Sequence, residues 1–171
     1  MTSLDYEQFV RREHAQLVRA LTLQLGDQAL AEQVVQDAFV RARERWDQVR
    51  AMASPRGWVY RVALNLARSW WRRQAAERRA YARHGSRALL RGDPPDPADV
   101  LTIRAALRRL PVRQREALVL RYFLDLPVAD TAALMGLREG SVKSLTHRAI
   151  NALRTDLLEV GITAEEVAED A

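Results

Sequence analysis

The sequence predicts an all-α protein built from two small helical domains joined by a flexible linker. Apolar residues recur at three- and four-residue steps along most of the chain, and no stretch shows the alternation typical of a strand. Residues 84–98 contain Pro94, Pro95 and Pro97, which are incompatible with a helix interior. The predicted units are therefore 1–83, the linker 84–98, a second domain 99–155 and an acidic tail 156–171.

The first domain is predicted to hold three helices. The first ends at Gly26, which suits a C′ position, and Asp27 is placed to cap the second. Residues 47–53 are expected to form a loop, and Ser54 then reads as the N-cap of a third helix running to about residue 80. The second helix is expected to bury Ala31, Val34, Val35, Ala38, Phe39, Ala42 and Trp46.

The second domain is predicted to contain helices at about 99–109, 111–124, 128–135 and 140–155. Gly136 permits a tight turn between the last two, which is the plan of a helix-turn-helix. A wheel of the last helix places Val142, Leu145, Thr146, Ala149 and Leu153 toward the core. Its opposite side carries hydrogen-bond donors suited to the DNA major groove, and a hairpin with a solvated basic face is the alternative. These donors are Lys143, Ser144, His147, Arg148, Asn151 and Arg154.

Charge is clustered along the chain. Residues 54–91 carry 10 basic and 1 acidic groups, residues 104–155 carry 10 and 4, and residues 156–171 carry 6 acidic groups and no basic one. Each basic block is a candidate footprint for a polyanion. Coding bias explains why Arg outnumbers Lys, but it does not explain this clustering.

Two further helical faces suggest binding surfaces. On the third helix, Trp58 and Trp71 flank a polar stripe, a combination that suits unpaired DNA, although core tryptophans and solvated arginines are an equal alternative. That stripe consists of Arg61, Asn65, Arg68 and Arg72. The second helix carries an outward row for which chemistry alone favours a solvated face: Gln33, Gln36, Asp37, Arg41 and Glu44.

Several classes of function are disfavoured. The chain has no cysteine and three scattered histidines, His14, His84 and His147, and we find no paired carboxylates or nucleophile–base set. We therefore expect a binding protein rather than an enzyme, with no cofactor and no metal site. No secretory signal and no long apolar run is visible, so we expect a cytoplasmic protein without membrane insertion.

Four stretches together resemble the extracytoplasmic-function (ECF) sigma factors of the sigma-70 superfamily. The resemblance covers roughly residues 5–155, and the order and spacing of the stretches match. They are GDQALAEQVVQDAFVRA (26–42), PRGWVYRVALNLARSWWRR (55–73), ALRRLPVRQREALVLRYFLDLPVADTAALMG (106–136) and GSVKSLTHRAINALR (140–154).

The resemblance implies a transcription initiation factor that binds the RNA polymerase core through the β′ clamp and the β flap. Residues 1–83 would be sigma region 2, and residues 99–155 would be region 4. The second-helix row named above, Gln36 and Asp37 foremost, would then bind the clamp. The −10 promoter element would meet Arg56, Trp58, Arg61, Asn65, Arg68 and Arg72. The −35 element would meet Ser141, Lys143, Ser144, His147 and Arg148. An anti-sigma factor is a further implied partner.

One departure from the family pattern concerns Leu145, where the family usually has arginine. Leu145 borders the core stripe, so one DNA contact is expected to be missing.

Two alternative functions are weighed against this one. A helix-turn-helix regulator that acts without polymerase would leave the first domain without a purpose. A recombinase would need a catalytic carboxylate or a Ser/Tyr cluster, and we find none in the sequence.

Overall fold

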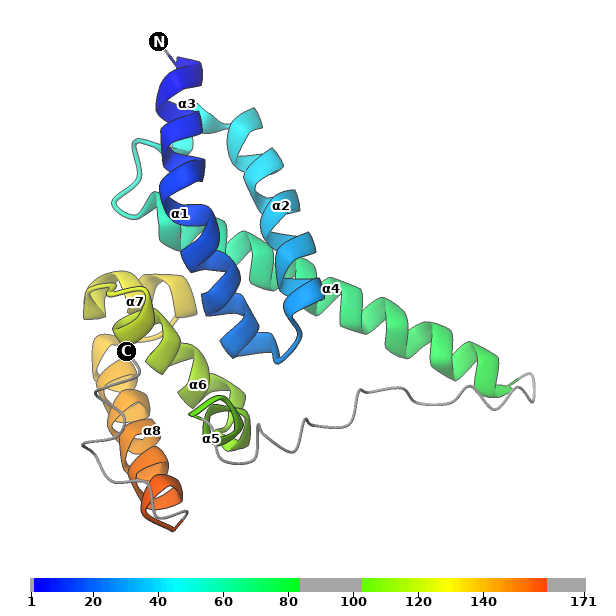
Figure 1. Cartoon of the computed structure of the whole chain (residues 1–171), viewed down its shortest axis with the longest axis vertical. Helices are drawn as coiled ribbons and strands as arrows, with labels where there is room; N and C mark the ends of the chain where they lie inside the picture. The colour runs from blue at the N-terminus through cyan, green and yellow to red at the C-terminus, as the bar shows by residue number, and fades with distance from the viewer. Residues whose placement is uncertain (1, 84–102, 160–171) are drawn as a thin grey trace.

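The computed structural model describes residues 2–83 and 103–159, and in these ranges all regular structure is helical (Figure 1). The all-α prediction is confirmed. The N-terminal lobe contains α1 (Thr2–Leu25), α2 (Gln28–Glu44), α3 (Trp46–Val49) and α4 (Pro55–Arg83). The C-terminal lobe contains α5 (Ile103–Arg109), α6 (Val112–Leu118), η2 (Val119–Phe123), α7 (Val128–Met135) and α8 (Glu139–Glu159). The predicted linker 84–98 and the tail from residue 160 onward lie outside the described residues.

Two predicted helix starts are confirmed at the level of atoms. The Asp27 carboxylate accepts a hydrogen bond of 2.9 Å from the Leu30 amide, and Gly26 has a φ of +74° before it. The Ser54 hydroxyl accepts a hydrogen bond of 3.1 Å from the Gly57 amide at the start of α4. Both caps satisfy amide groups that the first turn of a helix leaves without an internal partner.

The expected loop at 47–53 is partly wrong, because α3 occupies Trp46–Val49. The prediction also placed Trp46 on the second helix, whereas α2 ends at Glu44. Trp46 and Val49 lie one helical turn apart and are both buried, so the short helix lets the chain reverse while keeping both inside. The ring centroid of Trp46 lies 5.0 Å from that of Phe9 and 5.2 Å from that of Tyr6.

The single helix expected over 111–124 is interrupted. A π-helical turn, η2, follows α6, and the Leu124 amide donates to the Val119 carbonyl at 3.0 Å. A π turn widens the helix by one residue per turn. Val119, Leu120 and Leu124 in this segment are all buried.

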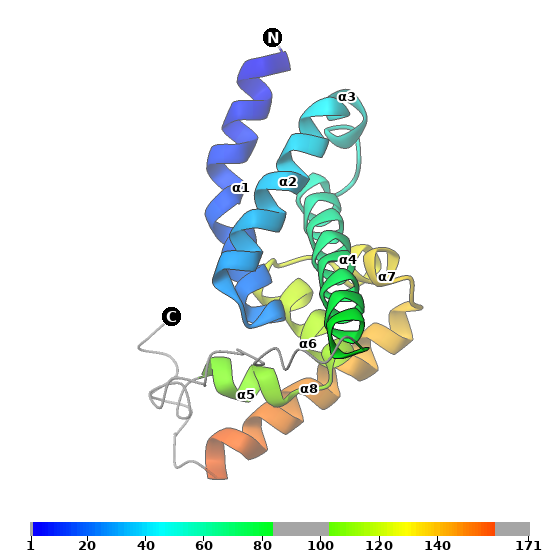
Figure 2. The same ribbon diagram turned by 90° about the vertical axis from the view of Figure 1, so that its right-hand side faces the viewer.

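The helix-turn-helix of the C-terminal lobe is present as predicted. Gly136 ends α7 with a φ of +65°, in the left-handed region where glycine is favoured. The chain then turns into α8, and α8 packs on α5, α6 and α7. Figure 2 shows α7 beside α4, and α8 running below α6 and α5.

The two lobes pack against each other, which the sequence did not predict. One buried cluster joins Leu17, Leu21 and Ala63 of the N-terminal lobe to Leu120 and Met135 of the C-terminal lobe. Helix α1 contacts α5, α6 and η2, and the first half of α4 contacts α7. The second half of α4 projects away from the body (Figure 1). None of the described helices combines the length and the apolar character needed to cross a bilayer.

Candidate nucleic-acid interface

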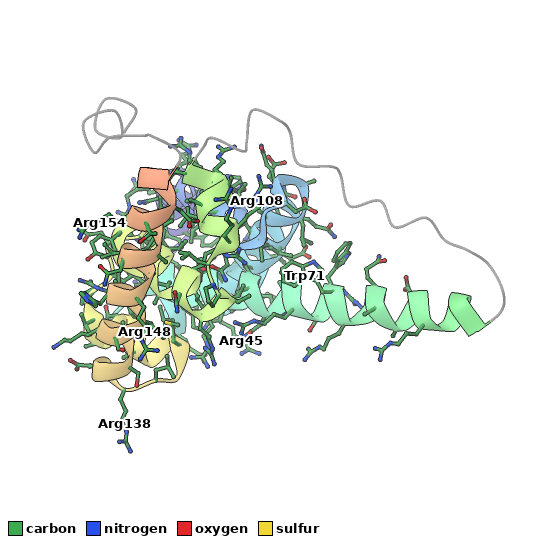
Figure 3. All side chains as sticks on the ribbon, turned by 90° about the horizontal axis from the view of Figure 1, so that it is seen from below. Arg45, Trp71, Arg108, Arg138, Arg148 and Arg154 are labelled. Carbon is green, nitrogen blue, oxygen red and sulfur yellow. The ribbon has the colours of Figure 1, made fainter. Side chains whose placement is uncertain are left out.

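The outward face of α8 presents the donors that the wheel predicted. Lys143, His147 and Arg148 are exposed, as is Ser141 near the start of the helix, whereas Ser144 is half-buried. The His147 Nε2 atom lies 3.0 Å from the amide nitrogen of Asn151, one turn along. Figure 3 shows Arg138 pointing away from the body at this end of the molecule, with Arg148 on α8.

The inner face of α8 anchors this row of donors. Val142 and Ala149 are fully buried, and the Thr146 hydroxyl donates to the Val142 carbonyl at 2.7 Å, which satisfies a buried polar group within the helix. Leu145 is half-buried against the shared core. Its side chain is therefore used for packing, in agreement with its predicted place at the border of the core stripe.

The row on α2 is exposed along its whole length, and the five predicted residues all lie on the solvent side. The opposite side of the helix, from Leu30 to Ala42, is buried. Val40 was not among the predicted residues; it lies between Asp37 and Arg41 on the same stripe, with 59% of its surface exposed. An exposed β-branched residue among polar neighbours was the signal that could have found it.

The polar stripe of α4 faces the C-terminal lobe. The Arg61 Nη1 atom donates to the Ala133 carbonyl on α7 at 3.3 Å. The Arg68 Nη2 atom lies 3.3 Å from Glu116 Oε2 on α6. Asn65, between them, is exposed. Arg72 is also exposed and donates to the Ser69 hydroxyl at 2.9 Å.

Arg56, at the start of α4, belongs to a second set of polar contacts. Its Nη1 atom donates to Gln16 Oε1 at 3.0 Å, and the Gln16 amide group donates to the Phe123 carbonyl of η2 at 3.1 Å. Its Nε atom lies 3.5 Å from the carboxylate of Glu13, which is almost fully buried. Gln16 thus links a predicted DNA contact of the N-terminal lobe to the backbone of the C-terminal lobe.

Glu116 lies at the boundary between the two lobes, where arginines from both lobes approach its carboxylate. It is only 4% exposed, with Arg68 at 3.3 Å and Arg113 at 3.8 Å. Burial raises the pKa of its carboxyl group, and the charges of Arg68, Arg113 and Arg61 oppose that increase without cancelling it. A buried carboxylate held by arginines of both lobes is a specific link between them.

The aromatic residues of α4 divide between core and surface. Trp58 and Trp70 are half-buried against the shared core, whereas Trp71 is 40% exposed where α4 leaves the body (Figure 3). On the side of α4 opposite the polar stripe, helical spacing places Val59, Val62, Leu66 and Trp70. Val59 is buried, but the other three are half-buried, and the most buried positions include Tyr60, Ala63, Leu64 and Ala67. Helix α4 packs on α1, α2 and α7, so its buried face is wider than one stripe.

The arrangement suits recognition of anionic and polar partners through charged helical faces. Across residues 2–83 and 103–159, no group of three or more His, Asp or Glu side chains is placed to hold a metal ion.

Comparison with known proteins assigns both lobes. Residues 9–77 match the sigma-70 region 2 family, and residues 101–153 match sigma-70 region 4. The chain belongs to the sigma-70 family. It is an RNA polymerase sigma factor of the extracytoplasmic-function group, the kind of subunit that directs polymerase to promoters.

Curated sigma factors align over most of this one. The RNA polymerase sigma-E factor of Streptomyces avermitilis is 30% identical over 166 residues, which span 90% of this chain and 86% of that protein. The ECF RNA polymerase sigma factor SigL of Mycobacterium tuberculosis is 34% identical over 157 residues, which span 88% of each chain.

Two solved sigma factors share the arrangement of both regions. One is RpoE of Bartonella quintana in complex with the anti-sigma factor NepR, with a TM-score of 0.70, 25% identity, and coverage of 90% of this chain and 96% of that one. The other is CnrH in complex with the cytosolic domain of CnrY, with a TM-score of 0.61, 26% identity, and coverage of 90% and 87%. Both alignments extend across regions 2 and 4.

Proposed function

We propose that this sigma factor binds the polymerase core through α2, reads the −35 element with α8 and holds unpaired −10 DNA on α4. It acts by binding and not by catalysis, and it works in the cytoplasm. The proposed domain limits are 1–83 for region 2, 84–98 for the linker, 99–155 for region 4 and 156–171 for the acidic tail.

The observation that carries this proposal concerns α2 and α8. Each of these helices has one buried face, and each carries a row of polar and charged side chains on the opposite, exposed face. The α2 row, with Asp37 and Arg41, is exposed beside Val40 and offers a polar surface with an apolar centre for the polymerase clamp. The α8 row offers donors from a helix narrow enough to enter a major groove. The β flap is the proposed partner of region 4.

The −10 assignment depends on residue types and their placement on α4. Arginine side chains suit phosphate oxygens, Asn65 offers both a donor and an acceptor to a base edge, and Trp58 and Trp71 provide flat faces for stacking. Displacing a base from the stack requires a few kcal/mol, which such contacts offset. An anti-sigma factor is a further proposed partner, since the similar RpoE structure is a complex with the anti-sigma factor NepR.

In vitro transcription with core polymerase on genomic fragments, with mapped start sites, tests the function. The Asp37→Arg variant should lose core binding while remaining folded, because it reverses a charge on the exposed row without touching the buried face. The matched control is Glu32→Arg, on the same helix but off the row. Unchanged affinity of Asp37→Arg for core polymerase would contradict the clamp assignment.

A further inference from the structure

An apolar groove of about 600 Å³ lies where α1, α5, η2 and α8 come together. Leu107 and Leu153 form its buried part, and the large side chains of Ile103 and Tyr122 also line it, with 45% and 62% of their surfaces exposed. None of the residues assigned above to the exposed rows of α2, α4 and α8 lines this groove. Exposed apolar side chains gathered around a hollow mark a surface on which another polypeptide segment can dock.

Two cations flank the groove. Arg19 on α1 and Arg104 on α5 both line it and are exposed, and neither has a hydrogen bond or an ion pair with another described residue. Guanidinium groups beside an apolar surface favour a partner that combines carboxylates with apolar side chains. The groove therefore fits an acidic segment that carries a few apolar residues.

Residues 160–171 of the same chain have this composition. They read VGITAEEVAEDA and contain no basic residue. The acidic residues are Glu165, Glu166, Glu169 and Asp170, and the β-branched apolar residues are Val160, Ile162 and Val167. The charge of the segment is thus opposite to that of the groove, although one exposed ion pair contributes only about 0.2–1 kcal/mol.

The segment also starts close to the groove. Helix α8 ends at Glu159, six residues after Leu153, which corresponds to about 9 Å along the helix axis. An extended chain covers about 3.3 Å per residue, so about three residues are enough to return over this distance. Residues 163–171 then remain to lie along the groove, and Gly161 falls where the chain has to reverse its direction.

We propose that residues 160–171 dock in this groove, with Val167 against Ile103 and Tyr122 and with the acidic side chains facing Arg19 and Arg104. Because the segment and the groove belong to one chain, the segment has a high effective concentration, and several weak contacts suffice to hold it. A protein that uses the same apolar surface has to displace the segment first. The inference concerns a surface outside the α2, α4 and α8 rows, so it does not depend on the roles proposed for them.

The position of the segment is measured by NMR on the full-length chain. The chain has no cysteine, so Ala171→Cys carries a single nitroxide label at the end of the segment farthest from α8. Paramagnetic relaxation should weaken the amide signals of Tyr122 and Leu153 most strongly and leave that of Val49 unchanged, because α3 lies at the opposite end of the molecule (Figure 1). If the largest loss falls on Lys143 of the proposed −35 face instead, the proposal is overturned.

Charge reversal tests the role of the two arginines. In the labelled chain, Arg19→Glu combined with Arg104→Glu should abolish the signal loss in the groove, because both attractions become repulsions. Arg45→Glu combined with Arg73→Glu is the matched control, since it makes the same change of net charge at exposed positions outside the groove. The control should keep the pattern of the parent chain. A groove variant that also keeps this pattern overturns the proposal.

Val167→Asp carries the test if circular dichroism shows that the double arginine variant has lost its helices, because it alters only the segment. It should reduce the signal loss, since a carboxylate does not pack against Ile103 and Tyr122 as a branched apolar side chain does. Ala164→Asp is its control, because it adds the same charge and leaves Val167 in place. Equal signal loss with Val167→Asp and with Ala164→Asp overturns the apolar contact and the proposal with it.

Removing residues 160–171 should open the groove. Anilinonaphthalene sulfonate, an apolar anion, should bind the shortened chain about threefold more tightly than the parent chain, the factor expected if the groove is covered about two thirds of the time. Adding Arg19→Glu and Arg104→Glu to the shortened chain should remove this gain. Residues 92–102 are also acidic and directly precede Ile103. If they cover the groove in place of residues 160–171, the shortened and parent chains bind the dye equally, and the proposal is overturned.

Discussion

Arg68 on α4 and Glu116 on α6 form an ion pair of 3.3 Å across the boundary between region 2 and region 4. The two ends of the pair differ in environment, because 42% of the Arg68 side chain is exposed and only 5% of the Glu116 side chain. Losing the arginine therefore leaves a nearly buried carboxylate with weaker compensation, whereas losing the carboxylate leaves an arginine that water can reach.

This asymmetry predicts the outcome of a double-mutant cycle. Arg68→Ala should destabilise the chain by about 1–2 kcal/mol, less than the 3–5 kcal/mol known for fully buried pairs, because Arg68 is partly solvated and Arg113 remains near Glu116. Arg68→Ala combined with Glu116→Gln should be less destabilising than the sum of the two single changes. Urea unfolding of the four proteins measures the coupling, and strict additivity would show that the pair does not interact.

A pH dependence follows from the raised pKa of Glu116. The packed chain holds the proton more strongly than the unfolded chain, so this group's contribution is most favourable below the ordinary value of 4.5 and is lost as pH rises through the raised pKa. The free energy of unfolding of Glu116→Gln, which cannot titrate at this position, should therefore fall less between pH 4.5 and neutrality than that of the parent chain. Thermal unfolding across this range checks it, and parallel curves for the two proteins would contradict the shift.

Gly57→Ala should weaken the boundary. The new Cβ atom would lie 2.6 Å from Leu134 Cδ1 and 2.8 Å from Ser54 Oγ, distances at which neighbouring atoms must move. We expect a loss of about 1–3 kcal/mol, as for other overpacked sites. Adding Leu134→Ala removes one of the two clashes, so the double variant should lose less than the two single losses combined. Chemical denaturation of all three variants distinguishes this from a clash with Ser54 alone, for which the two losses would be additive.

Two glycines of the helix-turn-helix should respond in opposite ways to alanine. Gly136 has a φ of +65°, so Gly136→Ala should cost about 1–2 kcal/mol although no atom lies within 4 Å of the new Cβ. Gly140 lies in α8 with equally open space around it, so Gly140→Ala should stabilise the chain by about 0.5–1 kcal/mol. Melting temperatures give the two signs, and equal effects would rule out a backbone origin.

The proposed −35 face predicts distinct roles for its exposed donors. Lys143→Ala should weaken binding to many duplex sequences and reduce the salt slope of affinity by about 1, if its ammonium group meets a phosphate. Ser144→Ala and His147→Ala should change the preferred base instead. Binding to a randomised duplex library at several salt concentrations measures both properties. Equal weakening of every sequence by all three variants would place base readout elsewhere.

The local features of the fold could be predicted from the sequence because they depend on neighbouring residues. Asp27 and Ser54 cap helices through contacts three residues away, and Gly136 supplies a backbone conformation that other residues disfavour. The buried and exposed sides of α2 and α8 followed from helical spacing, because each helix has one apolar stripe. The residues of the proposed −35 and polymerase faces were identified in the same way, and their roles remain proposals.

The short helix α3 and the π turn η2 were missed because tertiary packing decides them. Burying Trp46 together with Val49 outweighs the local preference for a loop in the first case. In the second, the Leu124 amide bonds to the Val119 carbonyl, five residues back, a local departure that no pattern of apolar residues records. Val40 differs from these two cases, because helical spacing alone places this apolar residue in the polar row of α2, where it is exposed.

By itself, the sequence of this sigma factor determined the helical class, the caps, the helix-turn-helix and the charged faces. Only the tertiary structure showed that regions 2 and 4 share one core and that Arg61 and Arg68 meet region 4. Ala133 lies 72 residues from Arg61 along the chain, and Glu116 lies 48 residues from Arg68. Helical periodicity cannot predict such contacts, because an arginine that suits a phosphate suits a buried carboxylate equally well. The packing of the lobes decides which of the two the arginine meets.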